Sequence, residues 1–466
     1  MPSGLSPKMS FLLELRQKKV AILGGGVTGT GLIQFCLNNG VEVILLDDSQ
    51  KEILGINSHT SLSPDLKLDL AIVSPGWRQD HPIVLELQAQ GVELIGELDF
   101  AWLVKEEIAP LQKWIALTGT NGKTTSIQMV ESILIAAGVN GKACGNVGEP
   151  AISALTGEQS FDVLAFELSS FQIQWSQLPR YEAVAILNIA EDHLDWHGSF
   201  DNYANAKLKL LTQTECAILN ISDPEIAART TAWNGKKIFF TLQTPNAGEL
   251  GIVEELLIDR AFVADPTQAA VVAELNDIQP TVPHNVANAL AAAGLALSIG
   301  VSHKNIQTGL KSFKLDRHRL QLIPTSDGIA WVDDSKATNP HAATAALLSY
   351  FSVIWIAGGL AKGASMSELI QRTSGRVKAA ILIGEDRELI AKALQTHAPK
   401  IPIYRIDKGG DVQHFAQAIV LKAQALATPG DTVLLAPACA SMDQFQNYAE
   451  RGNSFAAAVK KLVANE

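Results

Sequence analysis

Cysteine is scarce in this sequence, and long apolar segments are missing. Its four cysteines are scattered through 466 residues without a C-x-x-C pair, so we expect buried thiols in a reducing compartment. No apolar run approaches the length that spans a membrane. The segment 11–15 is too short and too charged for a secretory signal core. These absences favour a cytoplasmic protein that does not act at a membrane.

An excess of positive charge is also absent. The formal net charge is −11, whereas a nucleic-acid partner generally needs a basic face. We therefore expect no such partner, and any anionic ligand must be held by a few local groups. Hydrophobic residues make up 47% of the chain and charged residues 18%, as in globular proteins with full cores. The length suggests about three domains.

Apolar segments of strand length alternate with segments of helical pattern along almost the whole chain. This alternation predicts an α/β fold of three domains, each a mostly parallel sheet covered by helices. We place the domains at residues 1–112, 113–315 and 316–466. The expected strands are 20–23, 42–46, 70–73, 114–117, 163–166, 183–187, 330–334, 353–357, 379–383 and 432–436, and a long Ala-rich helix is expected over 285–299.

The most informative motif is G-T-N-G-K-T-T at 119–125, between the expected strand 114–117 and a helical pattern. Glycines let backbone N–H groups approach phosphate oxygens, and a helix N-terminus adds positive charge. Lys123 can reach the β/γ-phosphates, and the Thr124 hydroxyl can bind Mg²⁺. The motif predicts a P-loop in a chain that hydrolyses a nucleoside triphosphate or transfers a group from it. Its first glycine comes at 119, whereas the general G-x-x-x-x-G-K-[ST] pattern would place it at 117.

A second glycine motif, G-x-G-x-x-G at 24–29, follows the first expected strand, and Asp47 and Asp48 end the next one. This is the pattern of dinucleotide-binding Rossmann loops, so it admits an NAD-dependent oxidoreductase. The same glycines suit any βαβ unit that binds a diphosphate or packs tightly. Because nothing downstream suggests hydride chemistry, we predict a diphosphate near Gly26 to Gly29 in a Rossmann-like domain.

Four further polar segments each follow an expected strand. They are Glu167 to Gln172, Asn188 to His197, Asp333 to Pro340 and Ala436 to Phe445. Ligands of parallel α/β sheets bind at the carboxyl ends of the strands. Glu167 is a candidate Mg²⁺ ligand because hard cations prefer oxygen. Two histidines and three carboxylates within 191–197 indicate metal binding or catalysis, although one histidine alone would more often be an ordinary loop residue.

Seven motifs, in this order, resemble those of the Mur ligases, which are ATP-dependent amino-acid-adding enzymes of peptidoglycan synthesis. They are G-T-N-G-K-T-T, E-L-S-S-F-Q, N-x-x-E-D-H-L-D, H-N-V-x-N-A-L-A-A, H-R, D-D-S-K-A-T-N-P and P-A-C-A-S-x-D-Q-F. The K-A-T-N and S-x-D-Q-F segments are most similar to the member that adds D-glutamate. The resemblance implies an N-terminal domain for a UDP sugar, a central ATPase and a Rossmann-like C-terminal domain for the amino acid.

The resemblance also implies the reaction. The γ-phosphoryl group of ATP would pass to the terminal carboxylate of UDP-N-acetylmuramoyl-L-alanine, and the amine of D-glutamate would then attack the acyl phosphate. We expect a monomer that acts on these small molecules and uses two Mg²⁺. Lys207 matches the lysine that the family carbamylates, which would give Mg²⁺ an oxygen ligand. From its pattern alone, Lys207 lies beside Lys209 on a helix, and we would place it on a solvated face.

The residue roles that follow from the resemblance fall into five groups. The catalytic residues are Lys123, His193 and Lys207. The ATP site comprises Gly119, Thr120, Asn121, Gly122, Lys123, Thr124, Thr125, Asn285, Arg319 and Asp334. The UDP-sugar site comprises Gly26, Val27, Thr28, Gly29, Asp47, Ser74, Asn146, Ser169 and Gln172. The D-glutamate site comprises Lys336, Thr338, Lys362, Ser441 and Tyr448. The metal ligands are Thr124, Glu167, His193 and carbamylated Lys207.

The sequence departs from the family pattern at three places. Asp48 and Ser49 stand where the familiar enterobacterial type has Thr-Arg, so the uracil and phosphate contacts are open there. Leu360 replaces an aspartate, and Tyr448 replaces a phenylalanine.

Three alternative functions remain. They are another Mur-type ligase, a folylpolyglutamate synthase, which shares the ATPase, and a P-loop switch without ligase chemistry. A ligase for diaminopimelate or lysine should show a D-[DN]-P-R-like motif, which the chain lacks, and a switch would not need the C-terminal motifs.

Overall fold

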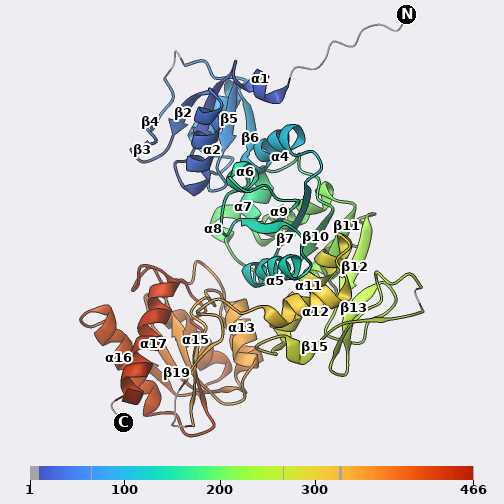
Figure 1. Cartoon of the computed structure of the whole chain (residues 1–466). Helices are drawn as coiled ribbons and strands as arrows, with labels where there is room; N and C mark the ends of the chain where they lie inside the picture. The colour runs from blue at the N-terminus through green and yellow to red at the C-terminus, as the bar shows by residue number, and fades with distance from the viewer. Residues whose placement is uncertain (1–9, 64–65, 266, 325–327, 465–466) are drawn as a thin grey trace, which may run out of the picture. The chain divides into compact units, whose positions relative to one another are not determined.

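The computed structural model describes residues 10–63, 66–265, 267–324 and 328–464. These residues form two compact units. Unit 1 comprises the described residues up to Ile189, together with Ala204–Ile278 and Asn285–Phe313; unit 2 comprises Ala190–Tyr203, Gln279–His284 and the described residues from Lys314 onward. The described residues contain three sheets, two in unit 1 and one in unit 2 (Figure 1). The expected α/β fold with mostly parallel sheets is confirmed, whereas the three domain boundaries stay a prediction.

The first sheet of unit 1 has the strand order β3-β4-β2-β1-β5-β6, and only the β3–β4 pair is antiparallel. Its strands are β1 (Lys19–Leu23), β2 (Glu42–Leu46), β3 (Glu52–Ile53), β4 (Ile56–His59), β5 (Leu70–Val73) and β6 (Glu93–Gly96). The helices are α1 (Phe11–Leu15), α2 (Val27–Asn38), α3 (Pro82–Ala89) and α4 (Glu97–Ile108). The expected strands correspond to β1, β2 and β5. All four residues of β5 are buried, as in parallel sheets with two covered faces.

The second sheet of unit 1 has the order β15-β14-β13-β12-β11-β10-β7-β9-β8 and turns antiparallel at β13, β14 and β15. Its strands are β7 (Lys113–Thr118), β8 (Gly141–Gly145), β9 (Val163–Glu167), β10 (Ala183–Ile186), β11 (Cys216–Asn220), β12 (Lys236–Phe240), β13 (Glu249–Val253), β14 (Leu256–Asp259) and β15 (Ala270–Glu274). The α-helices of this part are α5 (Lys123–Ala136), α6 (Ala151–Thr156), α7 (Ser170–Trp175), α10 (Pro224–Arg229), α11 (Pro283–Ser298) and α12 (His303–Ser312). The expected helix 285–299 corresponds to α11.

Small residues let the helices of this sheet approach closely. An ideal Cβ on Gly309 of α12 would lie 2.4 Å from the Cα of Ile133 in α5, and Figure 1 shows the two helices close together. An ideal Cβ on Gly294 of α11 would lie 2.9 Å from a side-chain carbon of Ile218 in β11. The Ala-rich sequence of α11 therefore serves close packing against the sheet that carries the P-loop.

The sheet of unit 2 has the order β16-β17-β21-β18-β19-β20, and only the β16–β17 pair is antiparallel. Its strands are β16 (Gln321–Ile323), β17 (Ala330–Asp333), β18 (Val353–Gly358), β19 (Val377–Ile383), β20 (Ile403–Arg405) and β21 (Thr432–Leu435). Its helices are α13 (Pro340–Leu348), α14 (Ser367–Thr373), α15 (Arg387–His397), α16 (Val412–Gln424) and α17 (Tyr448–Ala464). Unit 2 also contains α8 (Leu194–His197), whereas α9 (Phe200–Leu208) and the 3₁₀ helix η1 (Lys209–Gln213) lead into β11, and a second 3₁₀ helix, η2 (Leu275–Asp277), follows β15.

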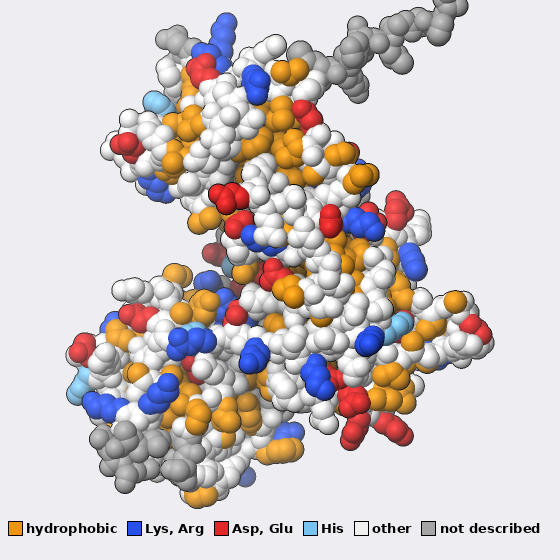
Figure 2. All heavy atoms as spheres, viewed as in Figure 1, with side chains coloured by type: hydrophobic (Ala, Val, Ile, Leu, Met, Phe, Trp, Pro, Cys, Tyr) orange, Lys and Arg blue, Asp and Glu red, His pale blue; other side chains and the backbone are white. Residues whose placement is uncertain are grey.

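The surface and the cysteines fit the composition. On the face drawn in Figure 2, the described Lys and Arg side chains are interspersed with Asp and Glu. None of the described helices combines the length and apolar character that a membrane crossing demands. Cys36, Cys144 and Cys439 are buried, and Cys216 is half-buried. The expectation of buried thiols is therefore confirmed for three of the four.

Two buried carboxylates of α4 connect the first sheet of unit 1 and its helices to the part of unit 1 built around the second sheet. Glu97 Oε1 accepts a hydrogen bond from the Ala151 backbone N–H (2.8 Å), at the start of α6. Asp99 Oδ1 accepts from the backbone N–H groups of Gln177 (2.7 Å) and Leu178 (3.0 Å), just after α7. Burial raises the pKa of Glu97 to about 7, although backbone hydrogen bonds from Ala151 and Ile152 oppose this. The carboxyl group therefore titrates near neutral pH.

Replacing Glu97 by Gln should remove part of the pH dependence of stability. A carboxyl with a raised folded-state pKa contributes stability that is complete below its ordinary pKa and is lost as the pH rises through the folded-state value of about 7. Between these values, wild type should lose up to about 1.4 kcal/mol per pH unit relative to Glu97→Gln. Urea unfolding of both proteins across this pH range measures the difference. Parallel pH profiles would contradict it, and the exposed Glu93→Gln provides a matched control.

Candidate active site

The shortened P-loop results from a strand that extends further than the general motif allows. Leu117 is fully buried inside β7, in register with Glu167 of β9 and Ala185 of β10. The strand ends only at Thr118, and α5 begins at Lys123. The position where the general pattern has its first glycine is therefore a core position, and the turn needs glycine only at 119 and 122.

Both loop glycines lie where a side chain would collide. Gly122 has φ +83°, and an ideal Cβ there would lie 2.3 Å from Asn288 Oδ1 of α11. An ideal Cβ on Gly119 would lie 2.9 Å from the Leu187 Cβ. Asn188, just after β10, accepts a hydrogen bond from the Asn121 backbone N–H (2.8 Å) and donates one to its carbonyl (3.0 Å). Asn188 was not among the predicted site residues, although it is the first residue of the N-x-x-E-D-H motif.

Two lysine ammonium groups meet at this loop. Lys123 Nζ donates to the carbonyls of Gly119 (2.7 Å) and Thr120 (2.9 Å), and Lys207 Nζ donates to the Gly119 carbonyl (3.0 Å). Lys207 is 1% exposed. The expectation of a solvated face for Lys207 is therefore wrong, because α9 turns this side chain toward the P-loop. The Lys123 ammonium suits an anionic ligand that the negative overall charge would not attract.

Glu167, at the end of β9, has the properties of a metal ligand. The side chain is 1% exposed, and its Oε1 accepts a hydrogen bond from Asn146 Nδ2 (2.9 Å). Its buried Oε2 has no hydrogen-bond partner among the described residues, which is costly for a carboxylate. The described residues contain no group of three or more His, Cys, Asp and Glu side chains that could hold a metal. One carboxylate is nevertheless enough for Mg²⁺ when phosphate and water oxygens complete its coordination.

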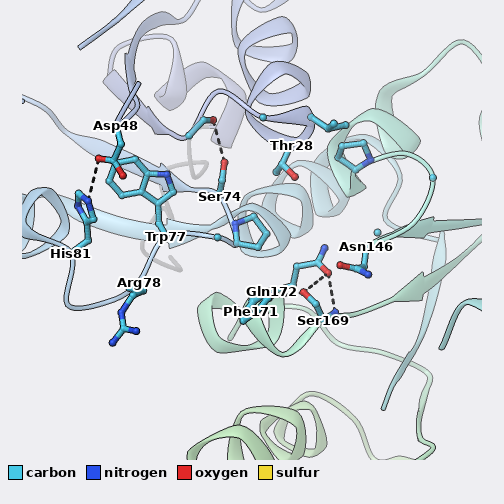
Figure 3. A pocket seen from close by; sticks show the side chains of 18 residues that line it. Thr28, Asp48, Ser74, Trp77, Arg78, His81, Asn146, Ser169, Phe171 and Gln172 are labelled. Carbon is cyan, nitrogen blue, oxygen red and sulfur yellow. Dashed lines mark hydrogen bonds and ion pairs between the residues drawn. The ribbon is translucent and has the colours of Figure 1, made fainter. Parts of the chain in front are cut away.

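A cavity of about 670 Å³ opens in unit 1 beside the glycine motif at 24–29 (Figure 3). Five segments line it: the glycine loop, Asp48 after β2, the segment after β5, the loop after β8 and the start of α7. The residues predicted for the UDP-sugar site that line it are Gly26, Val27, Thr28, Ser74, Asn146, Ser169 and Gln172. Gly29 and Asp47 are not among the lining residues. The cavity therefore gathers most of this predicted group, from both parts of unit 1.

Asp47 and Gly29 do not line the cavity but fix the conformation of the glycine loop. Asp47 Oδ2 accepts from the Gly25 backbone N–H (2.7 Å) and from Lys51 Nζ (3.2 Å), and Oδ1 accepts from the Ser49 hydroxyl (2.6 Å). Burial raises the pKa of Asp47, but these hydrogen bonds outweigh it and hold the pKa well below its usual range. An ideal Cβ on Gly29 would lie 1.8 Å from the Gly24 carbonyl oxygen, so only glycine fits where α2 meets the loop.

The cavity also contains Trp77 and His81, for which the sequence predicted no role, and Asp48, whose contacts the sequence left open. The Trp77 carbonyl accepts from Trp175 Nε1 (2.8 Å), and an ideal Cβ on Gly24 would lie 2.8 Å from Trp77 Nε1. The His81 ring lies edge-on to Trp77, with centroids 4.4 Å apart, and His81 Nε2 lies 3.2 Å from Asp48 Oδ1. Figure 3 shows Trp77, His81 and Asp48 together at one side. One sequence feature could have indicated this part of the cavity: the tryptophan of Ser-Pro-Gly-Trp, directly after the expected strand 70–73.

In unit 2, the structure brings the histidine-rich segment to two loops of the third sheet. A small cavity is lined by Glu191, Asp192 and Leu194, by Thr338 and Asn339, and by Ala361, Lys362 and Ala364. Asp192 Oδ2 accepts a long hydrogen bond from Asn339 Nδ2 (3.4 Å). His193, next in the chain, has φ +52°, an uncommon backbone conformation that often marks functional sites. Two of the residues predicted for D-glutamate, Thr338 and Lys362, thus line one cavity.

The remaining predicted residues lie at strand ends or on helices. Lys336 Nζ lies 3.9 Å from the centroid of the Tyr448 ring, a cation–π distance, and Ser441 is buried after β21. Burial raises the pKa of Asp334 to about 7, and its Oδ1 accepts from the Leu320 backbone N–H (3.1 Å). The last four residues predicted for the ATP site take these positions: Thr124 and Thr125 in the first turn of α5, Asn285 buried in α11, and Arg319 half-buried before β16.

Comparisons with known proteins give the class of this protein. Residues 117–296 match the Mur ligase middle domain, and residues 318–439 match the Mur ligase, glutamate ligase domain. A UDP-N-acetylmuramoylalanine–D-glutamate ligase from Thermobifida fusca is 44% identical over 97% of this chain and 100% of its own length. The enzyme of the same name from Streptomyces coelicolor is also 44% identical, over 97% of this chain and 99% of its own length. The chain belongs to the Mur ligase family of ATP-dependent ligases.

Solved structures share the fold at low sequence identity. A pseudomurein peptide ligase type C from Methanothermus fervidus is 19% identical with a TM-score of 0.61, covering 96% of this chain and 100% of that one. A MurF ligase from Thermotoga maritima, solved in complex with ADP, is 15% identical with a TM-score of 0.58, covering 97% and 98%. These likenesses support the three-sheet α/β architecture.

Gly122→Ala should weaken ATP binding more than it weakens the fold. An alanine with positive φ costs about 1–2 kcal/mol, and its Cβ would also displace Asn288 and the loop. We expect the KM for ATP to rise roughly tenfold or more, because displaced backbone N–H groups no longer point at the phosphate oxygens. Steady-state kinetics together with urea unfolding measure both effects.

Gly300→Ala is the matched control for this variant. Gly300 has φ +90°, but a Cβ there would have no neighbour within 4 Å. It should lose similar stability and keep the KM for ATP. Equal KM values for the two variants would show that the contact with Asn288 does not matter.

Proposed function

We propose that this protein is a ligase that adds D-glutamate to UDP-N-acetylmuramoyl-L-alanine at the expense of ATP, as a cytoplasmic monomer that makes peptidoglycan precursors. The observation that carries the proposal is the 44% identity, over essentially the full length of both chains, to ligases named for this reaction. The K-A-T-N and S-x-D-Q-F segments support D-glutamate as the amino acid.

The chemistry follows from the need to activate a carboxylate. The alanine carboxylate oxygen attacks the γ-phosphorus of ATP, ADP leaves, and an acyl phosphate forms. The amine of D-glutamate then attacks the acyl carbon, inorganic phosphate leaves, and the amine loses a proton as the amide forms. Lys123 and the amides of the P-loop balance the charge on the transferred group, so catalysis of the first step rests on positioning and electrostatics.

We assign metal binding to Thr124, Glu167, His193 and carbamylated Lys207, with two Mg²⁺ in the working enzyme. Bound Mg²⁺ would neutralise phosphate charge and orient the transferred group. The buried, unpartnered Oε2 of Glu167 supports its role as a ligand. The burial of Lys207 beside the P-loop supports carbamylation, since a carbamate there would offer oxygen ligands close to the triphosphate.

The substrates are assigned to the remaining groups. The UDP sugar occupies the cavity beside Gly26 to Gly29, where Trp77 offers an aromatic face on which a uracil base can stack. Asn285, Arg319 and Asp334 contact ATP. D-glutamate is assigned to a site formed by Lys336, Thr338, Lys362, Ser441 and Tyr448, because a dicarboxylate is bound by cations and hydroxyl donors.

An amino-acid panel tests the proposal directly. Phosphate release from ATP should require both UDP-N-acetylmuramoyl-L-alanine and D-glutamate, because the acyl phosphate turns over only when the amine attacks. The panel should include L-glutamate, L-lysine, diaminopimelate and L-alanine. Efficient turnover with any of these in place of D-glutamate would rule out the proposed specificity.

Lys207→Ala should lose on the order of 10² or more in rate, as when one preorganised stabilising group is removed. Short carboxylates such as formate should restore part of the rate if a carbamate is what the variant lacks. Labelled CO₂ should also give a carbamate NMR signal in wild type that the variant lacks. Lys209→Ala, at the neighbouring lysine, should stay close to wild type. If Lys207→Ala folds, is not rescued by carboxylates and still shows the carbamate NMR signal, carbamylation of Lys207 is refuted.

A further inference from the structure

Arg451, on α17, is a buried cation that the sequence analysis and the proposed mechanism leave unused. Its side chain is 2% exposed. Among the described residues it forms no ion pair with a carboxylate, and its partners are a hydroxyl and three carbonyls. Burial lowers its pKa to about 10, so the guanidinium stays charged at neutral pH.

All five guanidinium N–H donors are used. Nε donates to the Ser335 hydroxyl (3.0 Å), and Nη2 donates to the carbonyls of Ser335 (3.0 Å) and Cys439 (3.2 Å). Nη1 donates to the Cys439 carbonyl (3.2 Å) and, at a long 3.5 Å, to the Gly358 carbonyl. Hydrogen bonds from a charged donor are stronger than neutral ones, so one side chain fixes three backbone positions.

Those three positions belong to the loops that follow three neighbouring strands of the sheet. Ser335 follows β17, Gly358 ends β18 and Cys439 follows β21, and β21 lies between β17 and β18. Each loop carries a residue assigned to D-glutamate: Lys336 is next to Ser335, and Lys362 and Ser441 lie a few positions after Gly358 and Cys439. The guanidinium therefore joins the backbone of all three loops.

The loops that follow β18 and β21 contain backbone that needs such support. Lys362 has φ +51° and Ala438 has φ +60°, conformations that cost energy for residues with a side chain. Gly358 has φ +122°, and an ideal Cβ there would lie 1.8 Å from the Ile383 carbonyl oxygen. Strained backbone of this kind persists only where the surroundings hold it in place.

The first turn of α17 is itself fixed against this sheet. The Tyr448 carbonyl accepts from the Ser335 hydroxyl (2.7 Å), and the Tyr448 ring lies under the Lys336 ammonium. An ideal Cβ on Gly452 would lie 2.2 Å from His318 Nδ1. The buried pair of His318 and Asp333 (2.6 Å) thus lies against the helix beside Arg451.

We propose that Arg451 is a positioning residue that sets the spacing of Lys336, Lys362 and Ser441, and thereby the affinity for the dicarboxylate amino acid. The inference rests on the proposed function only for the identity of that amino acid. Lysine cannot replace Arg451, because a single ammonium has three donors and no planar fork. The side chain acts through the loops and makes no contact with the reacting atoms.

The test compares Arg451→Lys with wild type in steady-state kinetics for each substrate. The KM for D-glutamate should rise about tenfold or more, since small displacements of binding groups are costly. The KM values for ATP and UDP-N-acetylmuramoyl-L-alanine should change less than about twofold, in contrast to a general loss of structure. Arg372→Lys is the matched control, because Arg372 makes an exposed pair with Glu368 on α14. It should leave all three constants unchanged.

A second measurement does not depend on the substrate. Amide hydrogen exchange at 335–338, 358–362 and 438–441 should become faster in Arg451→Lys than in wild type, while the P-loop helix α5 stays protected. If Arg451→Lys does not fold, Ser335→Ala removes the Nε partner alone and should raise the KM for D-glutamate by a smaller factor.

The outcomes separate the inference from the proposed function. Unchanged exchange and an unchanged KM for D-glutamate in a folded variant would overturn the role of Arg451. An equal rise in all three KM values would also overturn it. Failure of wild type to use D-glutamate would instead refute the proposed function, and faster loop exchange would then still support the positioning role.

Discussion

The burial of parallel strands is the constraint on which this protein depends. β7, β9, β10, β18 and β21 are almost wholly apolar and inaccessible to water, so charged and polar groups can stand only where a strand ends. Because parallel strands end along the same edge, residues far apart in the chain become neighbours there. The P-loop follows β7, Glu167 ends β9 and Asn188 follows β10, and the order β10-β7-β9 makes these ends adjacent. The polar network of the P-loop follows from this geometry.

The same constraint operates in unit 2 with a different solution. The ends of β17, β21 and β18 lie side by side, but the loops that follow β21 and β18 have positive φ angles, at Ala438 and Lys362, and so need support from outside. A buried guanidinium from α17 does this with five hydrogen bonds to oxygen. In unit 1 the P-loop is held by its glycines, by the Asn188 side chain, and by hydrogen bonds from Lys123 and the buried Lys207 to loop carbonyls. The two units therefore hold comparable loops by different means.

The fold class and the central strands of each sheet could be predicted from the sequence, because buried parallel strands are short apolar runs. The expected strands 70–73 and 353–357 correspond to β5 and β18, and the Ala-rich segment 285–299 to α11. The short strands β3, β4 and β16 were not predicted, since two to four residues carry too little periodicity. The parallel strands β6, β8, β11, β12 and β20 and the antiparallel edge β13–β15 were also missed. The group predicted for the UDP sugar lines one cavity except for Gly29 and Asp47, which shape the loop behind it.

The sequence by itself determined the chemical classes: a P-loop from its glycines and Lys123, a metal-ligand candidate at Glu167, and the family from seven ordered motifs. These depend on local patterns, in which residue type and spacing suffice. Only the tertiary structure decided what surrounds each group. Lys207 has the pattern of a surface lysine and is buried at the Gly119 carbonyl. Asp48 pairs with His81 beside Trp77, and Arg451 joins three loops more than ten residues away in sequence. Burial and long-range hydrogen bonds arise from packing, which no local pattern records.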